Sequence, residues 1–169
     1  MAWAGATMKL SEKGLDLIKL FEGCKLKMYK DQAGYPTIGI GHKLTPEELK
    51  TGLITIYGKT HLWANGLTEE QIEDLKYQDA DYCEAVINAH VKVLLNQYQY
   101  DAIVSFIFNV GVGAFLRSTL LKKINEKRFK DVPNEINKWT FITSNGKKIV
   151  SNGLKNRRDA EIKLWQEVV

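Results

Sequence analysis

Apolar positions near the start of the chain recur at a spacing of three to four residues. Leu15, Ile18 and Phe21 follow this spacing, which is typical of one face of an α-helix. Gly23 stands where the glycine that follows a helix C-terminus belongs. The pattern therefore predicts a first helix that ends at Glu22.

After Gly23 the pattern changes to the alternation of apolar and polar residues that is typical of a β-strand. Residues 25–30 alternate in this way, residues 31–34 have the composition of a turn, and residues 35–40 favour a returning strand. This stretch therefore predicts a β-hairpin or a three-stranded sheet.

The next segments are less uniform. Thr45 and Pro46 begin a predicted short helix, because proline is favoured at the first helical position. Residues 51–67 contain too many large apolar side chains for a plain surface loop. They either pack beneath the hairpin or form one wall of a cleft, and we favour packing.

Helical patterns dominate the rest of the chain. Thr68 and Gln71 form a capping-box pattern that opens a long predicted helix over about 69–90. The helix predicted over 97–110 is apolar nearly all round, which indicates a central buried position. The remaining predictions are a helix capped by Ser118, a short helix from Asp131, a hairpin or loop around 147–150, and a final helix from about Lys155 that carries Ala160, Leu164, Trp165 and Val168.

These elements predict an α+β fold in a single domain over residues 1–169. A small N-terminal lobe with the hairpin or sheet covers about 10–67, a connecting helix about 69–90, and a helical C-terminal lobe about 91–169. A chain of 169 residues is long enough to bury a substantial core in such an arrangement.

Composition narrows the possible functions. The apolar content of 44% and charged content of 26% are those of a globular protein, and the formal net charge of +4 favours an anionic partner without demanding one. Because no dense basic face is present, nucleic-acid binding is not expected. The three histidines are scattered, so neither a metal site nor another cofactor is predicted. Residues 1–9 are too short and too mixed for a signal peptide or a membrane span.

The candidate chemistry lies at the first helix end and the hairpin. Glu22 and Asp31 are carboxylates on different elements, and glycoside hydrolysis requires one protonated and one ionised carboxyl group facing a gap. The negative end of the helix favours the protonated form of Glu22, whereas Asp31 on a polar turn should stay ionised. Thr37 offers a hydroxyl that can hold a water beside Asp31. This spacing alone would match many unrelated chains.

Several longer motifs give the spacing a context. They are FEG, YKD, GY.TIGIGH and LTPEE in the first third, DAIVSFIFNVGVGAF..STLL at 101–121, and GLKNRRDAE at 153–161. In this order, over about residues 9–165, they resemble the phage-type lysozymes, the endolysins of glycoside hydrolase family twenty-four, which include the lysozyme of T-even phage.

The resemblance implies a lysozyme-like fold with a cleft between the lobes. It also implies hydrolysis of the β-1,4 bond between N-acetylmuramic acid and N-acetylglucosamine in peptidoglycan glycan strands. Glu22 would be the general acid, and Asp31 with Thr37 would activate water on the opposite face of the sugar. Inversion, which the family suggests, predicts carboxyl groups about 6.5–9.5 Å apart, whereas retention predicts about 5–5.5 Å.

Matching positions imply further roles for residues of this chain. The implied substrate-binding residues are Tyr29, Gly41, Lys43, Phe108, Asn109 and Ser118. Lys43 replaces an apolar residue and Asn109 a glutamine of the family prototype, so their contacts are open. Tyr29 and Phe108 could equally be core aromatics.

Three residues are expected to support the site. The resemblance pairs His42 with Asp79, a carboxylate in line with the apolar residues of the long helix, although His42 could instead contact substrate. The resemblance also implies an ion pair between Arg157 and Glu22, although an arginine on a terminal helix could instead be solvated or salt-bridged on the surface. A paired cation favours the ionised form of Glu22 and therefore opposes the effect of the helix end.

Two other functions remain compatible with the sequence. A lytic transglycosylase would cleave the same bond with a single acid, and a non-catalytic peptidoglycan-binding module would need none of the three residues. The presence of Glu22, Asp31 and Thr37 together favours the hydrolase. We expect a monomer without stable membrane insertion, located in the host cytoplasm until the membrane is opened and then in the periplasm or cell wall.

Overall fold

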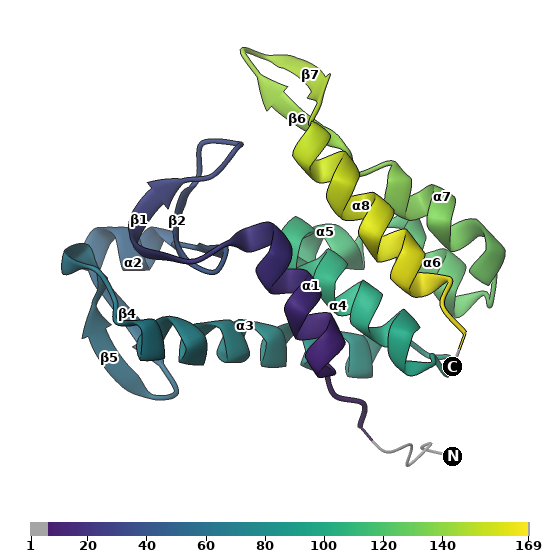
Figure 1. Ribbon diagram of the computed structural model, residues 1–169, viewed down its shortest axis with the longest axis horizontal. Helices are drawn as coiled ribbons and strands as arrows, with labels where there is room; N and C mark the ends of the chain where they lie inside the picture. Colours follow the sequence, from purple (N-terminus) through teal and green to yellow (C-terminus); the bar gives the residue numbers. More distant parts are fainter. Residues whose placement is uncertain (1–6, 169) are drawn as a thin grey trace.

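The computed structural model describes residues 7–168, and Figure 1 shows a sheet-containing part joined to a helical part by the long helix α3. Residues 1–6 belong to the stretch for which no signal peptide is predicted, and they lie outside the described residues. The first elements are α1 (Glu12–Glu22), β1 (Lys25–Lys30), β2 (Pro36–Gly39), β3 (His42–Lys43), α2 (Pro46–Thr51), β4 (Leu53–Ile56), β5 (Lys59–Leu62) and a 3-10 turn, η1 (Trp63–Asn65).

The predicted hairpin is the first two strands of a three-stranded antiparallel sheet in the order β1-β2-β3. Tyr29 lies opposite Thr37, and Ile38 lies opposite His42. Gly23, with a φ of 65°, ends α1 directly before β1, as the pattern predicted. The register therefore places the functional candidates of β1 and β2 next to each other.

Within residues 51–67, β4 and β5 form a second hairpin that the sequence analysis did not predict. Ile54 and Ile56 of β4 are buried, while the residues between and opposite them are largely exposed. Tyr57 and Gly58 make the two-residue turn, with φ values of 45° and 79°. A tyrosine with a positive φ is uncommon, so rules based on typical turn residues do not predict this turn. The favoured interpretation, packing, is confirmed for Ile54 and Ile56, whereas Tyr57 and Leu62 are 55% and 49% exposed, and no residue of 51–67 lines the cleft described below.

The helical part is built around α4 (Gln97–Val110), which follows α3 (Glu69–His90). Residues 100–107 of α4 are all buried, so the expected central helix is observed. Helix α4 packs against α1, α3 and α8, and Figure 1 shows α1 lying beside α4. Packing on α4 thus holds the C-terminal end of α1, and with it Glu22, close to the last helix.

The remaining elements are α5 (Val112–Leu116), α6 (Thr119–Asn125), a 3-10 turn η2 (Phe129–Asp131), α7 (Val132–Asn137), β6 (Phe141–Ser144), β7 (Lys147–Val150) and α8 (Asn152–Trp165). The predicted hairpin at 147–150 is therefore β6–β7. Among residues 7–168, no helix has both the length and the apolar character that a bilayer crossing needs.

The last helix differs from its prediction in two ways. It begins at Asn152 rather than near Lys155, because the Ser151 hydroxyl accepts the Leu154 amide at 3.2 Å and caps it earlier. It also ends at Trp165, so Val168, which the prediction placed on this helix, lies beyond it and is 89% exposed. The buried face consists of Arg157, Arg158, Glu161, Leu164 and Trp165.

Candidate active site

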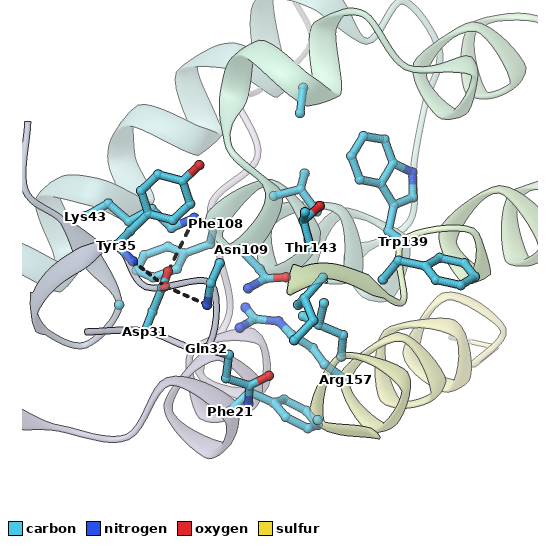
Figure 2. A pocket seen from close by; sticks show the side chains of 18 of the residues that line it. Phe21, Asp31, Gln32, Tyr35, Lys43, Phe108, Asn109, Trp139, Thr143 and Arg157 are labelled. Carbon is cyan, nitrogen blue, oxygen red and sulfur yellow. Dashed lines mark hydrogen bonds and ion pairs between the residues drawn. The ribbon is translucent and has the colours of Figure 1, made fainter. Parts of the chain in front are cut away.

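A cleft of about 1040 Å³ lies between the sheet-containing part and the helical part. Glu22, Asp31 and Thr37 all line it, although they come from a helix end, a turn and a strand. Figure 2 shows the hairpin residues Asp31 and Tyr35 on one side and Trp139 and Thr143 on the other. The arrangement that the sequence required, one shared groove for the three candidates, is present.

Glu22 is the last residue of α1, and its side chain is only 14% exposed. One carboxylate oxygen, Oε1, accepts a hydrogen bond from Arg157 Nη1. The other oxygen, Oε2, lies against Gly41, where an added Cβ would collide with it. Gly41 has a φ of 74°, so this position requires glycine both for its backbone and for the close approach of the carboxylate.

Asp31 is held by its own turn. Its Oδ1 accepts hydrogen bonds from the backbone amides of Ala33 at 2.9 Å and Tyr35 at 2.8 Å. Its Oδ2 lies 3.7 Å from Lys43 Nζ, and Figure 2 shows Tyr35 and Lys43 next to Asp31. Two amide donors and a cation thus surround a carboxylate, an arrangement that suits a group acting in its charged form.

Thr37 is buried in β2, with 2% of its surface exposed, yet it lines the cleft. Its hydroxyl donates to the Tyr35 carbonyl at 2.9 Å. Because that proton is already used, Thr37 Oγ1 is left to accept a hydrogen bond. A water in the cleft could therefore direct one proton to Thr37 and the other to Asp31.

Tyr29 lies within the electrostatic influence of both Glu22 and Asp31. Burial raises the pKa of the Tyr29 phenol, and the negative charges of Glu22 and Asp31 add to the increase. Both carboxylates are thus near enough to act on one side chain. Tyr29 lines the cleft while remaining half-buried, so it is a cleft residue rather than a purely core aromatic.

The other implied substrate-binding residues also line the cleft, and several have structural partners. They are Gly41, Lys43, Phe108, Asn109 and Ser118. Lys43 lies beside Asp31 and over the Tyr35 ring, with Nζ 4.9 Å from the ring centroid. Asn109 Oδ1 accepts from Arg158 Nη2 at 2.5 Å, and Ser118 Oγ caps α6. Phe108 both lines the cleft and packs on the core.

The structure contains the predicted pair of His42 and Asp79, with His42 Nδ1 2.8 Å from Asp79 Oδ2. A second partner was missed, because Glu48 Oε2 lies 3.2 Å from His42 Nε2. Burial opposes protonation of His42, but the hydrogen bonds and charges of Asp79 and Glu48 outweigh it and raise the pKa of His42 to about 9. His42 is not among the residues that line the cleft, so its position favours the pairing role.

The expected ion pair of Arg157 and Glu22 is also present, but it belongs to a larger buried cluster. Arg158 and Glu161 complete this cluster with fully buried side chains. The sequence analysis missed both, although 157, 158, 161, 164 and 165 follow the spacing of one buried helix face. Charged residues on such a stripe are a signal for buried pairing.

A second missed group comes from the C-terminal hairpin and its surroundings. The additional cleft-lining residues include Trp139, Phe141, Thr143 and Lys148. Gln32 approaches from the opposite part, where its Oε1 accepts from Ser151 Oγ at 2.8 Å. The available sequence signal for this wall was Phe141, an aromatic residue at an expected polar hairpin. In the structure Phe141 is 50% exposed.

In the described part of the chain, residues 7–168, no three His, Cys, Asp or Glu side chains lie together in a way that could hold a metal ion. The chemistry that this cleft offers from its own residues is proton transfer between carboxyl groups, an ordered water and a substrate.

Comparisons with known proteins identify the family of this chain. The family model described as phage lysozyme matches residues 19–161. The endolysin of Acyrthosiphon pisum secondary endosymbiont phage 1 is 40% identical over 159 residues, which are 94% of this chain and 99% of that protein.

Two solved structures are similar over nearly the whole chain. The endolysin from Escherichia coli O157:H7 phage FAHEc1 is 39% identical, with a TM-score of 0.76 and coverage of 96% of each chain. The muramidase domain of SpmX from Asticaccaulis excentricus is 31% identical, with a TM-score of 0.76 and coverage of 95% of this chain and 99% of that one.

Proposed function

The chain belongs to the phage lysozyme family, and from this premise we propose how its cleft cleaves the glycan strands of bacterial peptidoglycan. The protein is a lysozyme of the endolysin type, a hydrolase that acts on the cell wall. The bond we propose is the β-1,4 link between N-acetylmuramic acid and N-acetylglucosamine. The single observation that carries the mechanism is that Glu22, Asp31 and Thr37 line one cleft.

Glu22 is the general acid in this proposal. Its protonated form donates to the oxygen of the glycosidic bond as the bond to the sugar carbon breaks. Gly41 and Arg157 hold the carboxyl group from two directions, which limits its orientation. A fixed orientation is what a proton donor needs, since the proton must lie within hydrogen-bond reach of the leaving oxygen.

Asp31 and Thr37 supply the water. One proton of the water points to Asp31 and the other to Thr37 Oγ1, which can only accept. The lone pair of the water then faces the sugar carbon, and Asp31 takes up the proton as the new bond forms. Attack from the face opposite the leaving group inverts the configuration at that carbon.

Two product measurements test this mechanism. Mass spectrometry of digested peptidoglycan should find reducing sugar ends, whereas anhydro-sugar ends would identify a lytic transglycosylase. NMR of the first-formed product should show the α-anomer. An initial β-anomer would contradict inversion, and binding without any cleavage would indicate a non-catalytic module.

We also propose that the protein acts as a monomer, without nucleic acid and without stable membrane insertion. It would stay in the host cytoplasm until the membrane is opened and then reach the periplasm and cell wall. Size-exclusion chromatography with light scattering tests the oligomeric state. Fractionation of infected cells before and after membrane opening tests the location, and an early periplasmic pool would contradict it.

A further inference from the structure

Behind Glu22 lies a group of four charges, formed by Glu22, Arg157, Arg158 and Glu161. The side chains of Arg158 and Glu161 are fully buried, and those of Arg157 and Glu22 are 3% and 14% exposed. Buried charges act strongly on each other because little water screens them. A change in any of the four will therefore be felt at Glu22.

Arg157 divides its hydrogen bonds among three groups. Nη1 donates to Glu22, Nε donates to Glu161 at 3.1 Å, and Nη2 donates to the Ser105 carbonyl at 3.0 Å. The contact joins Glu22, the last residue of α1, to the middle of α8, although the two residues are 135 positions apart in sequence. Arg157 thus orients the proposed acid while a second carboxylate shares its charge.

Glu161 is the partner of both arginines. Its Oε1 accepts from Ser105 Oγ at 2.8 Å as well as from Arg157, and its Oε2 lies 3.1 Å from Arg158 Nε. Burial lowers the pKa of Arg158 to about 10, with Glu161 opposing the decrease and Arg157 adding to it. Arg158 therefore stays charged at neutral pH. Burial raises the pKa of Glu161, while the charges of Arg158 and Arg157 and the hydrogen bonds from Ser105 and Arg157 oppose that increase, so Glu161 is the carboxylate placed between the two arginines.

The surroundings of the cluster add few other charges. Tyr29 of β1 and Asp31 face the same cleft as Glu22. On α7, which packs on α8, Glu135 is paired with Lys138 at 2.9 Å. On α4 the polar partners are Ser105 and Asn109, which are neutral. Beyond Glu22 itself, the nearest contacts thus leave Glu161 as the carboxylate that balances the two arginines.

We propose that Glu161 is a positioning residue that keeps Glu22 able to carry a proton. With Glu161 present, two carboxylates face two guanidinium groups, and Arg157 can orient Glu22 without binding it permanently as an anion. Without Glu161, both positive charges act on Glu22 alone and hold it ionised. The proposal rests on the function proposed above for Glu22.

The test is the pH dependence of glycan hydrolysis by charge variants of the full-length protein. The basic limb of the profile reports loss of the acid's proton. In Glu161→Gln we expect this limb to move to lower pH by about one unit, which lowers the rate above the limb about tenfold. In Arg158→Gln the excess charge is negative, so the limb should move to higher pH. The double variant restores the balance and should return to the wild-type limb.

A matched control separates this effect from simple loss of a buried carboxylate. Glu84 on α3 is also buried and is paired with Lys9 at 2.7 Å, but it does not line the cleft. Glu84→Gln should lower the melting temperature and leave the basic limb unchanged. If Glu161→Gln does not fold, the basic limbs of Arg158→Gln and of the double variant still test the proposed role of Glu161.

An unchanged basic limb in the folded charge variants, or movement in the opposite direction, overturns the role of Glu161 while the proposed hydrolase function stands. Activity of Glu22→Gln equal to wild type would instead remove the proposed acid. The two failures are therefore distinguishable in the same set of measurements.

Discussion

Glu22 and Asp31 face the same cleft, but the protein holds them by different kinds of contact. Asp31 accepts hydrogen bonds from amides two and four residues further along the chain. Glu22 is held by Arg157, which lies 135 positions away and is itself buried in a cluster of charges. One carboxylate is positioned by its own turn and the other by the packing of three helices.

This difference has a functional consequence. A turn suits a carboxylate that is to stay ionised. Folding of the turn points backbone amides at the carboxylate, and these hydrogen-bond donors favour its negative charge. A carboxylate that is to donate a proton needs a more balanced environment, and only side chains brought from elsewhere can supply compensating charges of both signs. The two sides of the cleft should therefore respond differently to substitution.

The largest expected effect is at Glu22. Glu22→Gln keeps the size of the side chain and an acceptor for Arg157 but has no proton to donate to the leaving oxygen. We expect hydrolysis to fall by about 10²–10⁴-fold while the protein stays folded. Clearing of a peptidoglycan suspension measures hydrolysis, and circular dichroism measures folding. Glu12→Gln, at the other end of α1, is the control. Clearing at the wild-type rate would exclude Glu22 as the acid.

Asp31→Asn should have the next largest effect, because the amide oxygen can still accept from the turn while the base is lost. We expect a rate decrease of about 10²-fold with an unchanged melting temperature. Asp16→Asn, an exposed position on α1, is the matched control. Substantial residual hydrolysis, together with anhydro-sugar products, would favour the one-acid mechanism.

His42→Gln tests how much the contact between His42 of β3 and Asp79 of α3 stabilises the protein. The pKa of His42 is raised from 6.5 to about 9, so its stabilising effect is complete below about pH 6.5 and is lost as pH rises through about 9. We expect Glu48 and Asp79 to lose a charged partner, costing on the order of 2 kcal/mol at pH 6. Urea unfolding at pH 6 and pH 10 should show a much smaller difference at pH 10. Equal differences at both pH values would contradict a charged His42.

Gly41→Ala tests whether the hairpin also positions Glu22. The added Cβ would meet the Glu22 carboxylate, so we expect an approximately tenfold lower rate from a displaced acid, consistent with the sensitivity of catalysis to small misplacements. Gly58→Ala is the control, because its φ of 79° gives similar backbone strain with open space around the new Cβ. The two variants should lose similar stability, and a similar loss of rate in both would argue against displacement.

Lys43→Met should have the smallest effect. Its Nζ is 3.7 Å from Asp31 and the side chain is 52% exposed, so solvent and salt screen the pair. We expect a two- to fivefold change in rate at low salt that roughly halves at about 0.5 M salt, where screening is strong. Lys43→Arg, which keeps the charge, should stay near wild type. A larger loss in Lys43→Met would indicate direct contact between Lys43 and the substrate.

The sequence determined the elements whose signals are local. The end of α1 at Glu22, the turn that begins at Asp31 and the capping box at the start of α3 all depend on residues within a few positions of each other. Family motifs then predicted part of the cleft lining, and each cleft residue predicted in this way lines the observed cavity, but the wall formed by the C-terminal hairpin was missed. Neither kind of signal located the hairpin β4–β5, because its turn uses a tyrosine in an uncommon conformation.

The tertiary structure decided which distant charges meet. The sequence analysis assigned no role to Arg158, whereas packing of α8 on α4 buries this residue with Glu161 behind Glu22. Packing between elements likewise brings Glu48 into contact with His42 and Gln32 into contact with Ser151. A turn or a cap is encoded by neighbouring residues, but the electrostatic environment of a buried carboxylate depends on every element packed around it, and that arrangement exists only after the chain has folded.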